Sequence, residues 1–81
     1  MELIDTCKLM VSDDYKDRFR AEYYQTKIRY EKLHSLIVKY DAGVIGFKLN
    51  CPIELLKKQC SIMGEYLYRL EMRAEIEDIV I

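Results

Sequence analysis

The sequence is short of the residues from which most metal and catalytic sites are built. Its 81 residues include one histidine, His34, and three cysteines, Cys7, Cys51 and Cys60, without any Cys-x-x-Cys pair. A four-ligand zinc site would need all four of these residues to converge from distant positions, so we expect no metal and no other cofactor. An odd number of unpaired cysteines favours free thiols and a cytoplasmic location.

The sequence also lacks the runs and motifs that mark membrane proteins and common enzymes. No stretch approaches the roughly 18 apolar residues of a membrane span. The start of the chain has no basic region or signal-peptide apolar run. Phosphate-binding glycine loops, His-Glu-x-x-His and Gly-x-Ser-x-Gly do not occur. We therefore predict no membrane as a partner and no enzymatic activity.

An excess of charge of either sign is missing as well. Thirteen Lys and Arg stand against fourteen Asp and Glu, and the formal net charge is −1. No global field attracts nucleic acid, so we do not expect it as a partner. With 51% hydrophobic and 33% charged residues, the composition is typical of a folded helical protein rather than a disordered one.

What the sequence does have is the same heptad pattern in two stretches. In the first stretch, spacings of four and three residues alternate through Phe19, Tyr23, Thr26, Tyr30, Leu33, Ile37 and Tyr40. In the second, spacings of three and four alternate through Ile53, Leu56, Cys60, Met63, Leu67, Leu70 and Ala74. A repeat near 3.5 residues is typical of helices that pack along a seam. The two stretches therefore predict an antiparallel hairpin.

Capping and turn residues set the expected boundaries. A single domain, 1–81, would contain a short N-terminal helix or arm (1–11), a long helix (13–41), a loop (42–51), a second long helix (52–77) and a tail (78–81). Ser12 is the expected N-cap of the first long helix, and Gly43 its left-handed C-terminal cap. Pro52 suits the first turn of the second long helix. The predicted fold class is all-α, a coiled-coil-like hairpin with a short N-terminal helix.

A second apolar stripe flanks the seam on each helix. It consists of Ala21, Tyr24, Ile28 and Leu36 on the first helix and of Leu55, Ile62, Tyr66 and Ile76 on the second. A hairpin alone covers one stripe per helix, and a chain of this length cannot enclose a large core. We therefore predict that the stripe binds a partner, most simply another copy of the chain, in a homo-oligomer.

The open end of the hairpin carries the candidate ligand-binding residues. Setting Tyr40 opposite Ile53 places residue i roughly opposite residue 93 − i. This register gathers Arg18, Arg20, Tyr24, Tyr66, Arg69 and Arg73. Guanidinium groups bind phosphate oxygens in pairs and tyrosine rings stack on bases, so the set suits a nucleotide. The alternative is that these arginines form ion pairs with Glu22, Glu65, Glu71, Glu75 and Glu77.

Gly64 is unusual because it lies within the second long helix. Glycine costs about 1 kcal/mol there relative to alanine. The register places Gly64 opposite Arg29 and Tyr30. We interpret it as packing room for the Tyr30 ring, with a close approach by a ligand as the alternative.

Three motifs carry a resemblance to known proteins. They are Arg-Phe-Arg-Ala-Glu-Tyr at 18–23, Lys-Leu at 32–33, and the second-helix set Glu54-Leu55-Leu56, Gln59 and Met63-Gly64-Glu65-Tyr66-Leu67. With these motifs, residues from about 13 to 77 resemble a family of small helical-hairpin proteins of crAss-like phages and of Firmicutes phages and prophages. The resemblance implies a phage-encoded, cytoplasmic, all-helical protein. It implies no activity by itself.

A broader analogy suggests a function. Several unrelated small phage proteins are oligomeric sponges that bind nucleotide signals of bacterial defence between their subunits. Small size, surplus apolar surface and arginine beside tyrosine are similar to that class. We therefore predict an anti-defence protein that sequesters a nucleotide immune signal, of the cyclic ADP-ribose type or a cyclic oligonucleotide, without cleaving it. The alternative is a helical interaction module that binds and inhibits a host protein.

Overall fold

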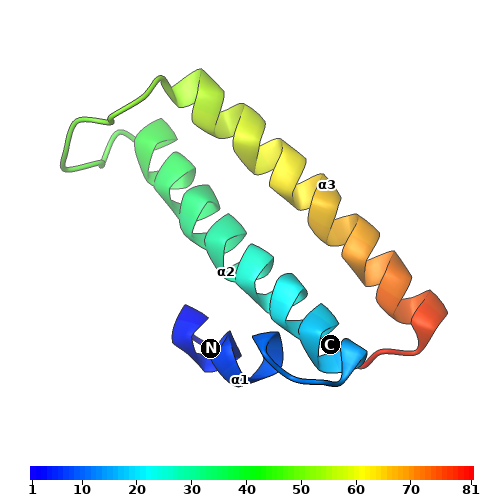
Figure 1. Cartoon of the computed structure of the whole chain (residues 1–81). Helices are drawn as coiled ribbons and strands as arrows, with labels where there is room; N and C mark the ends of the chain where they lie inside the picture. Colours follow the sequence, from blue (N-terminus) through cyan, green and yellow to red (C-terminus); the bar gives the residue numbers. More distant parts are fainter.

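The computed structural model describes residues 1–81 and contains helices and no strands. A 3₁₀ turn, η1 (Leu3–Thr6), leads into the short helix α1 (Cys7–Met10), and the long helices α2 (Tyr15–Asp41) and α3 (Ile53–Glu77) follow. The long helices form an antiparallel hairpin, and η1 and α1 lie against α2 on the side away from α3 (Figure 1). The predicted all-α class and helical hairpin with a short N-terminal helix are confirmed. No helix combines the length and apolarity needed to cross a bilayer.

The two long helices pair close to the predicted register. The Tyr23 hydroxyl donates a hydrogen bond to Glu71 at 2.8 Å, one residue from the predicted position 70. A Cβ atom added to Gly64 would lie 3.2 Å from Cε1 of Tyr30, so glycine does make room for this ring. The register is therefore shifted by about one residue from the prediction.

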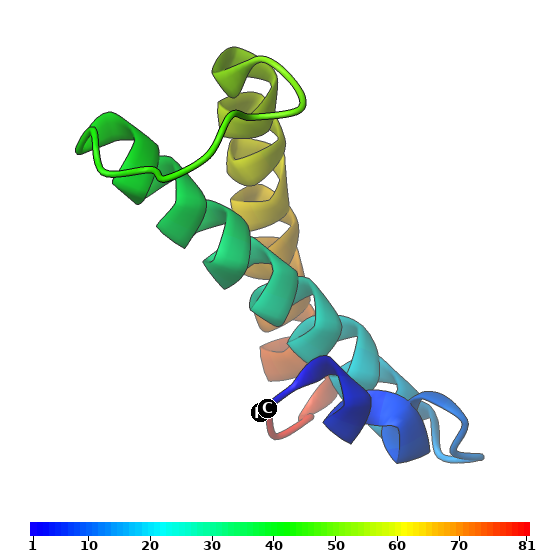
Figure 2. The ribbon, with the colours of Figure 1, turned by 90° about the vertical axis from the view of Figure 1, so that its left-hand side faces the viewer.

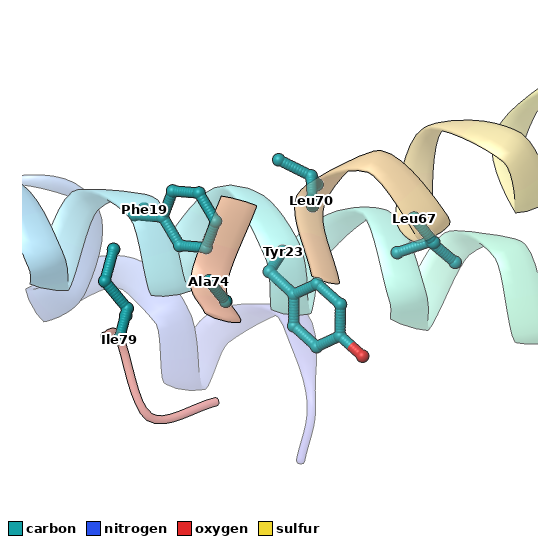
Figure 3. Close-up of a cluster of buried hydrophobic side chains, with 6 residues drawn as sticks. All are labelled: Phe19, Tyr23, Leu67, Leu70, Ala74 and Ile79. Atoms are coloured by element: carbon teal, nitrogen blue, oxygen red, sulfur yellow. The ribbon is translucent and has the colours of Figure 1, made fainter. Parts of the chain in front are cut away.

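The hydrophobic core lies at the end of the hairpin near the two chain termini. Its members are Phe19, Tyr23, Leu67, Leu70, Ala74 and Ile79, drawn from α2, α3 and the tail (Figure 3). Leu70 is 0% exposed. Burying a leucine side chain fully is worth about 1.5–3 kcal/mol, so this cluster fixes one end of the hairpin.

Toward the connecting loop, α2 and α3 diverge (Figure 2). The seam residues Leu33, Ile37, Leu56 and Met63 are only half-buried there, and Tyr40 is exposed. The seam is thus closed at the core end and partly open at the loop end.

The start of α2 differs from the sequence prediction. Asp14 is the N-cap, since its Oδ1 accepts a hydrogen bond from the Lys16 amide at 2.9 Å. Ser12 lies before the helix, where its hydroxyl accepts from the Asp14 amide at 3.1 Å and donates to Asp17 at 2.9 Å. The prediction of Ser12 as N-cap is wrong, because a carboxylate two residues later satisfies the helix amides and also complements the helix dipole.

The loop after α2 turns on Gly43, whose φ of 75° is left-handed, as predicted. The amides of Gly43 and Val44 donate to the carbonyls of Tyr40 and Lys39, each at 3.0 Å. Further along, two apolar side chains are largely uncovered: Val44 is 68% exposed and Phe47 63% exposed. The fold therefore leaves an apolar loop surface open.

The flanking stripe is covered at the start of α2 and open along α3. Ala21 is buried, and one turn later Gln25 donates a hydrogen bond to the buried Thr6 of the N-terminal segment at 2.9 Å. The prediction that this part of α2 needs a separate partner is wrong, because the N-terminal segment of the same chain lies on it. The α3 stripe stays exposed at Leu55, Ile62, Tyr66 and Ile76.

The C-terminal tail is held by both long helices. Asp78 takes a left-handed φ of 56°, and the Ile79 amide donates to the Ala74 carbonyl at 2.9 Å. This turn buries Ile79 in the core. Lys16 and Arg20 of α2 bind the backbone carbonyls of the tail, so the tail closes the end of the hairpin.

Candidate functional site

Arg73 has the most internal contacts of the predicted ligand-binding residues. Its Nη2 donates to the Tyr15 hydroxyl at 2.9 Å, and its Nε lies 3.4 Å from Glu77. The guanidinium carbon lies 5.0 Å from the centre of the Phe19 ring. The hydrogen bond with Tyr15, helped by Glu77, raises the pKa of Arg73 above its usual value. Arg73 is therefore a fixed cation at the core end of α3.

Tyr66 and Arg69 share the face of α3 that carries Arg73, because the three residues are spaced by three and four. Arg69 lies 3.6 Å from Glu65, and the two side chains are 60% and 68% exposed. Tyr66 is exposed as well, so its ring is accessible for stacking. The structure thus brings two guanidinium groups and one aromatic ring onto one surface, which we call the α3 face (Tyr66, Arg69 and Arg73).

Arg20 and Tyr24 take part in packing around the core end of the hairpin. Arg20 Nε donates to the Val80 carbonyl at 2.8 Å, and its Nη1 donates to Asp17 at 3.0 Å. Tyr24 is half-buried and meets the Tyr23 ring edge-on, with centroids 5.6 Å apart. Arg20 is therefore engaged by the tail, and Tyr24 by its neighbouring ring.

Arg18 and Arg20 point to different sides of α2. Two residues along an α-helix turn a side chain through about 200°. Arg18 Nη1 donates to the Ser12 carbonyl at 2.8 Å, in the turn between α1 and α2, whereas Arg20 reaches the tail. The structure does not gather all four arginines around one point. A role of the six residues in binding stays a prediction.

Two of the predicted arginines do form ion pairs with glutamates, as the alternative interpretation expects, and both pairs lie on α3. Arg69 pairs with Glu65 and Arg73 with Glu77, each four residues away. An exposed pair of this kind is worth about 0–1 kcal/mol. A phosphate, which accepts charge-assisted hydrogen bonds from the same guanidinium groups, competes with such a pair. The ion pairs therefore leave room for an anion on the α3 face.

A hollow that the sequence did not predict lies beside α2 at the loop end. Its volume is about 760 Å³, and its walls come from α2, the loop and the first two residues. We call it the α2 groove and define it by Lys32, Ser35, Leu36, Lys39, Ile45 and Phe47. The apolar residues of the loop were the one sequence signal for it, but a sequence does not show which face of α2 they meet.

Metal-ligating side chains are not grouped in this fold. No three side chains of His, Cys, Asp and Glu lie close enough to hold a metal ion. The three cysteines are free thiols, of which Cys60 is buried in the seam and Cys7 is exposed on α1. The α3 face and the α2 groove therefore offer cations, hydroxyls and aromatic rings, with carboxylates beside them.

Fold and surfaces together define a small all-helical hairpin protein with exposed arginine, lysine and aromatic groups suited to an anionic ligand. The family model described as Sequestin matches residues 13–76, which span α2, the loop and nearly all of α3. The chain belongs to the Sequestin family. Comparison with curated proteins and with solved structures gives no match. The family name points to sequestration of a signal molecule, which fits the sponge analogy, while the phage origin stays a prediction.

Proposed function

We propose that the protein is a homo-oligomeric sponge that binds a nucleotide immune signal, of the cyclic ADP-ribose type or a cyclic oligonucleotide, and holds it without cleaving it. Membership of the Sequestin family over residues 13–76 carries this proposal. Sequestration requires tight binding and no chemical step, so a small hairpin is sufficient for it. In a phage-infected cell the sponge lowers the free concentration of the signal in the host cytoplasm.

The α3 face is the surface that best suits the phosphates and base of such a signal. Arg69 and Arg73 stand one helical turn apart, and guanidinium groups bind phosphate oxygens through paired hydrogen bonds. Arg73 is already held by Tyr15 and the Phe19 ring, so little side-chain entropy is lost when a ligand binds. Tyr66 supplies a ring on which a base stacks, a contact worth about 1–3 kcal/mol.

A second copy of the chain completes this surface in the proposal. Leu55, Ile62 and Ile76 follow the same side of α3 and are exposed, Ile76 by 83%. Exposed apolar side chains that recur along one helix side are typical of an interaction site. Pairing of α3 with α3 of a second copy about a two-fold axis covers both stripes at once, since the same patch serves on both subunits. The ligand then lies between two α3 faces.

The exposed α3 stripe also favours the second candidate function, an interaction module that inhibits a host protein. An apolar helix face can dock into a groove of another protein through residues at heptad spacing. In that case the arginines set the orientation of the complex and bind no small molecule. The two functions therefore differ in what binds the α3 face.

Titration calorimetry against a panel of cyclic ADP-ribose isomers and cyclic dinucleotides tests the sponge. We expect sub-micromolar binding of one ligand, weakened at least tenfold in Arg69→Ala and in Arg73→Ala. Lys8→Ala is the matched control, because it removes an exposed cation of α1. Arg20→Ala is a less specific probe, since it also releases the tail carbonyl.

Two further measurements test the remaining parts of the proposal. Mass spectrometry of the ligand released by heat denaturation should recover it unchanged, and a cleavage product would contradict a sponge. Light scattering of the ligand-bound protein should give a multiple of 9.7 kDa, and a monomer would contradict the shared site. If no nucleotide of the panel binds in calorimetry and a host protein co-purifies instead, the result contradicts the sponge and favours the interaction module.

A further inference from the structure

The α2 groove is a second recess that the α3 face does not use. Its volume of about 760 Å³ lies within the roughly 300–1,000 Å³ of ligand pockets. Met1 and Glu2 line it on one side, and the loop residues Val44, Ile45 and Phe47 line it on another. Its loop wall is apolar, whereas its α2 wall is mixed, with Ile28 and Leu36 beside polar and charged side chains.

The polar side chains of the α2 wall are two lysines and a serine, with the carboxylate of Glu31 beside them. Lys32, Ser35 and Lys39 are spaced by three and four residues, so the two lysines start about 10.5 Å apart along the helix axis. The four ion pairs of the chain are made by Arg20, Lys57, Arg69 and Arg73. Both groove lysines are thus free of carboxylate partners. Their flexible stems let two ammonium groups converge above Ser35.

The loop wall is apolar and exposed, and a backbone hydrogen bond anchors its first residue, Val44. The Val44 amide donates to the Lys39 carbonyl at 3.0 Å, which ties the loop to the end of α2. Val44 and Phe47 nevertheless remain largely exposed. An exposed phenylalanine ring beside two free cations is the combination that binds a base and a phosphate together.

We propose that the α2 groove is a second nucleotide-binding site of this protein. Lys32 and Lys39 bind the phosphates, Ser35 donates its hydroxyl to a phosphate oxygen, and the base stacks on Phe47. Two carboxylates, Glu2 and Glu31, also line the groove, and in this proposal Glu31, next to Lys32 in the chain, accepts hydrogen bonds from ribose hydroxyls. A bare phosphate has no ribose hydroxyls to donate to Glu31, so the Glu31 carboxylate would only repel it. We therefore expect the groove to bind a nucleotide more tightly than a bare phosphate. The ligand class rests on the proposed function, but the residues are different.

A tryptophan reporter tests the groove directly, because the chain contains no tryptophan. Phe47→Trp keeps an aromatic ring in the groove and gives an emission that excitation at 295 nm separates from the tyrosines. Tyr66→Trp provides the equivalent reporter for the α3 face. Both proteins are titrated with cyclic ADP-ribose and cyclic dinucleotides, and separately with inorganic pyrophosphate. We expect saturable changes for both reporters with one nucleotide, and at least tenfold weaker binding of pyrophosphate at Phe47→Trp.

The lysines are tested in the background of each reporter. Lys32→Ala with Lys39→Ala should weaken the response of Phe47→Trp at least tenfold and leave that of Tyr66→Trp unchanged. Lys8→Ala removes an exposed cation of α1 that belongs to neither surface, and it should change neither response. Circular dichroism checks that each variant keeps its helix content.

The outcomes separate this inference from the proposed function. A response of Tyr66→Trp without one of Phe47→Trp overturns the groove and keeps the sponge. If only Phe47→Trp responds, and its response depends on Lys32 and Lys39, the ligand binds the groove and does not bind the α3 face. Equal binding of pyrophosphate and nucleotide at Phe47→Trp overturns the nucleotide assignment. No response of either reporter, together with silent calorimetry, overturns both.

Discussion

Gly64 gives a direct test of how closely the two long helices approach. Alanine is favoured over glycine within a helix by about 1 kcal/mol, so Gly64→Ala would stabilise the protein if the space were empty. A Cβ atom there would lie 3.2 Å from Cε1 of Tyr30 and 3.6 Å from its hydroxyl. Carbon atoms in favourable contact are about 3.5–4.0 Å apart, so the ring must move by a few tenths of an ångström.

The Tyr30 ring is restrained from making this movement. It stacks on His34 with ring centroids 5.9 Å apart, and it packs against the core cluster. Overpacking in such a place costs about 1 kcal/mol or more. We therefore expect the two effects of Gly64→Ala to cancel, with a net change in the free energy of unfolding within about 0.5 kcal/mol of zero. In a Tyr30→Ala background the ring is absent, and the full gain of about 1 kcal/mol should appear.

Urea denaturation followed by circular dichroism measures this difference as a double-mutant cycle. The four proteins are the parent chain, Gly64→Ala, Tyr30→Ala and the double variant. All are compared at one protein concentration, because the stability of an oligomer depends on it. A coupling of roughly 0.5–1.5 kcal/mol is expected. If Gly64→Ala stabilises both backgrounds equally, the Tyr30 ring does not limit the helix approach and the packing interpretation is wrong.

Three other predictions concern the core, the cap and the response to pH. Leu70→Ala should lower the free energy of unfolding by about 3–5 kcal/mol, because Leu70 is fully buried, and a loss below about 1 kcal/mol in urea titrations would contradict its central place. Asp14→Ala should cost about 1 kcal/mol, since it removes the hydrogen bond to the Lys16 amide, and an unchanged urea midpoint would argue against this N-cap. Burial and the hydrogen bond to Glu71 raise the pKa of Tyr23 from 10.0 to about 12, so the folded state keeps a proton that the unfolded chain loses. Stability should therefore fall as the pH rises from about 10 to 12, and Tyr23→Phe should flatten this fall when urea midpoints are compared across that range.

The arrangement of the hairpin could be predicted because two heptad stretches of similar length, joined by a short loop, permit few antiparallel registers. Tyr23 accordingly faces Glu71, one residue from the predicted position. The N-cap could not be predicted with the same certainty. Ser12 and Asp14 both fit the preference for small polar residues at a cap. The choice depends on the path of the turn from α1, which heptad spacing does not describe.

The candidate site was predicted less well, for a reason of geometry. A register gives the height of a residue along the hairpin, and it does not give the side of the helix on which the residue lies. Arg18 and Arg20 are near one another in height but about 200° apart around α2. The tail binds one of them and the turn before α2 binds the other. The angle of each residue around the helix, counted from the seam, can be calculated from the sequence, and it places Arg18 and Arg20 on opposite sides of α2.

The unequal packing along the hairpin explains why the two proposed ligand surfaces differ in kind. At the core end, buried side chains fix the backbone, and Arg73 is held by Tyr15 and the Phe19 ring before any ligand arrives. At the loop end the helices diverge, and Lys32 and Lys39 have no partner to hold them. A fixed guanidinium selects a phosphate by direction, whereas a mobile ammonium attracts it by charge. A sponge with both surfaces would bind one ligand through fixed guanidinium groups at the closed end of the hairpin and another through mobile ammonium groups at the open end.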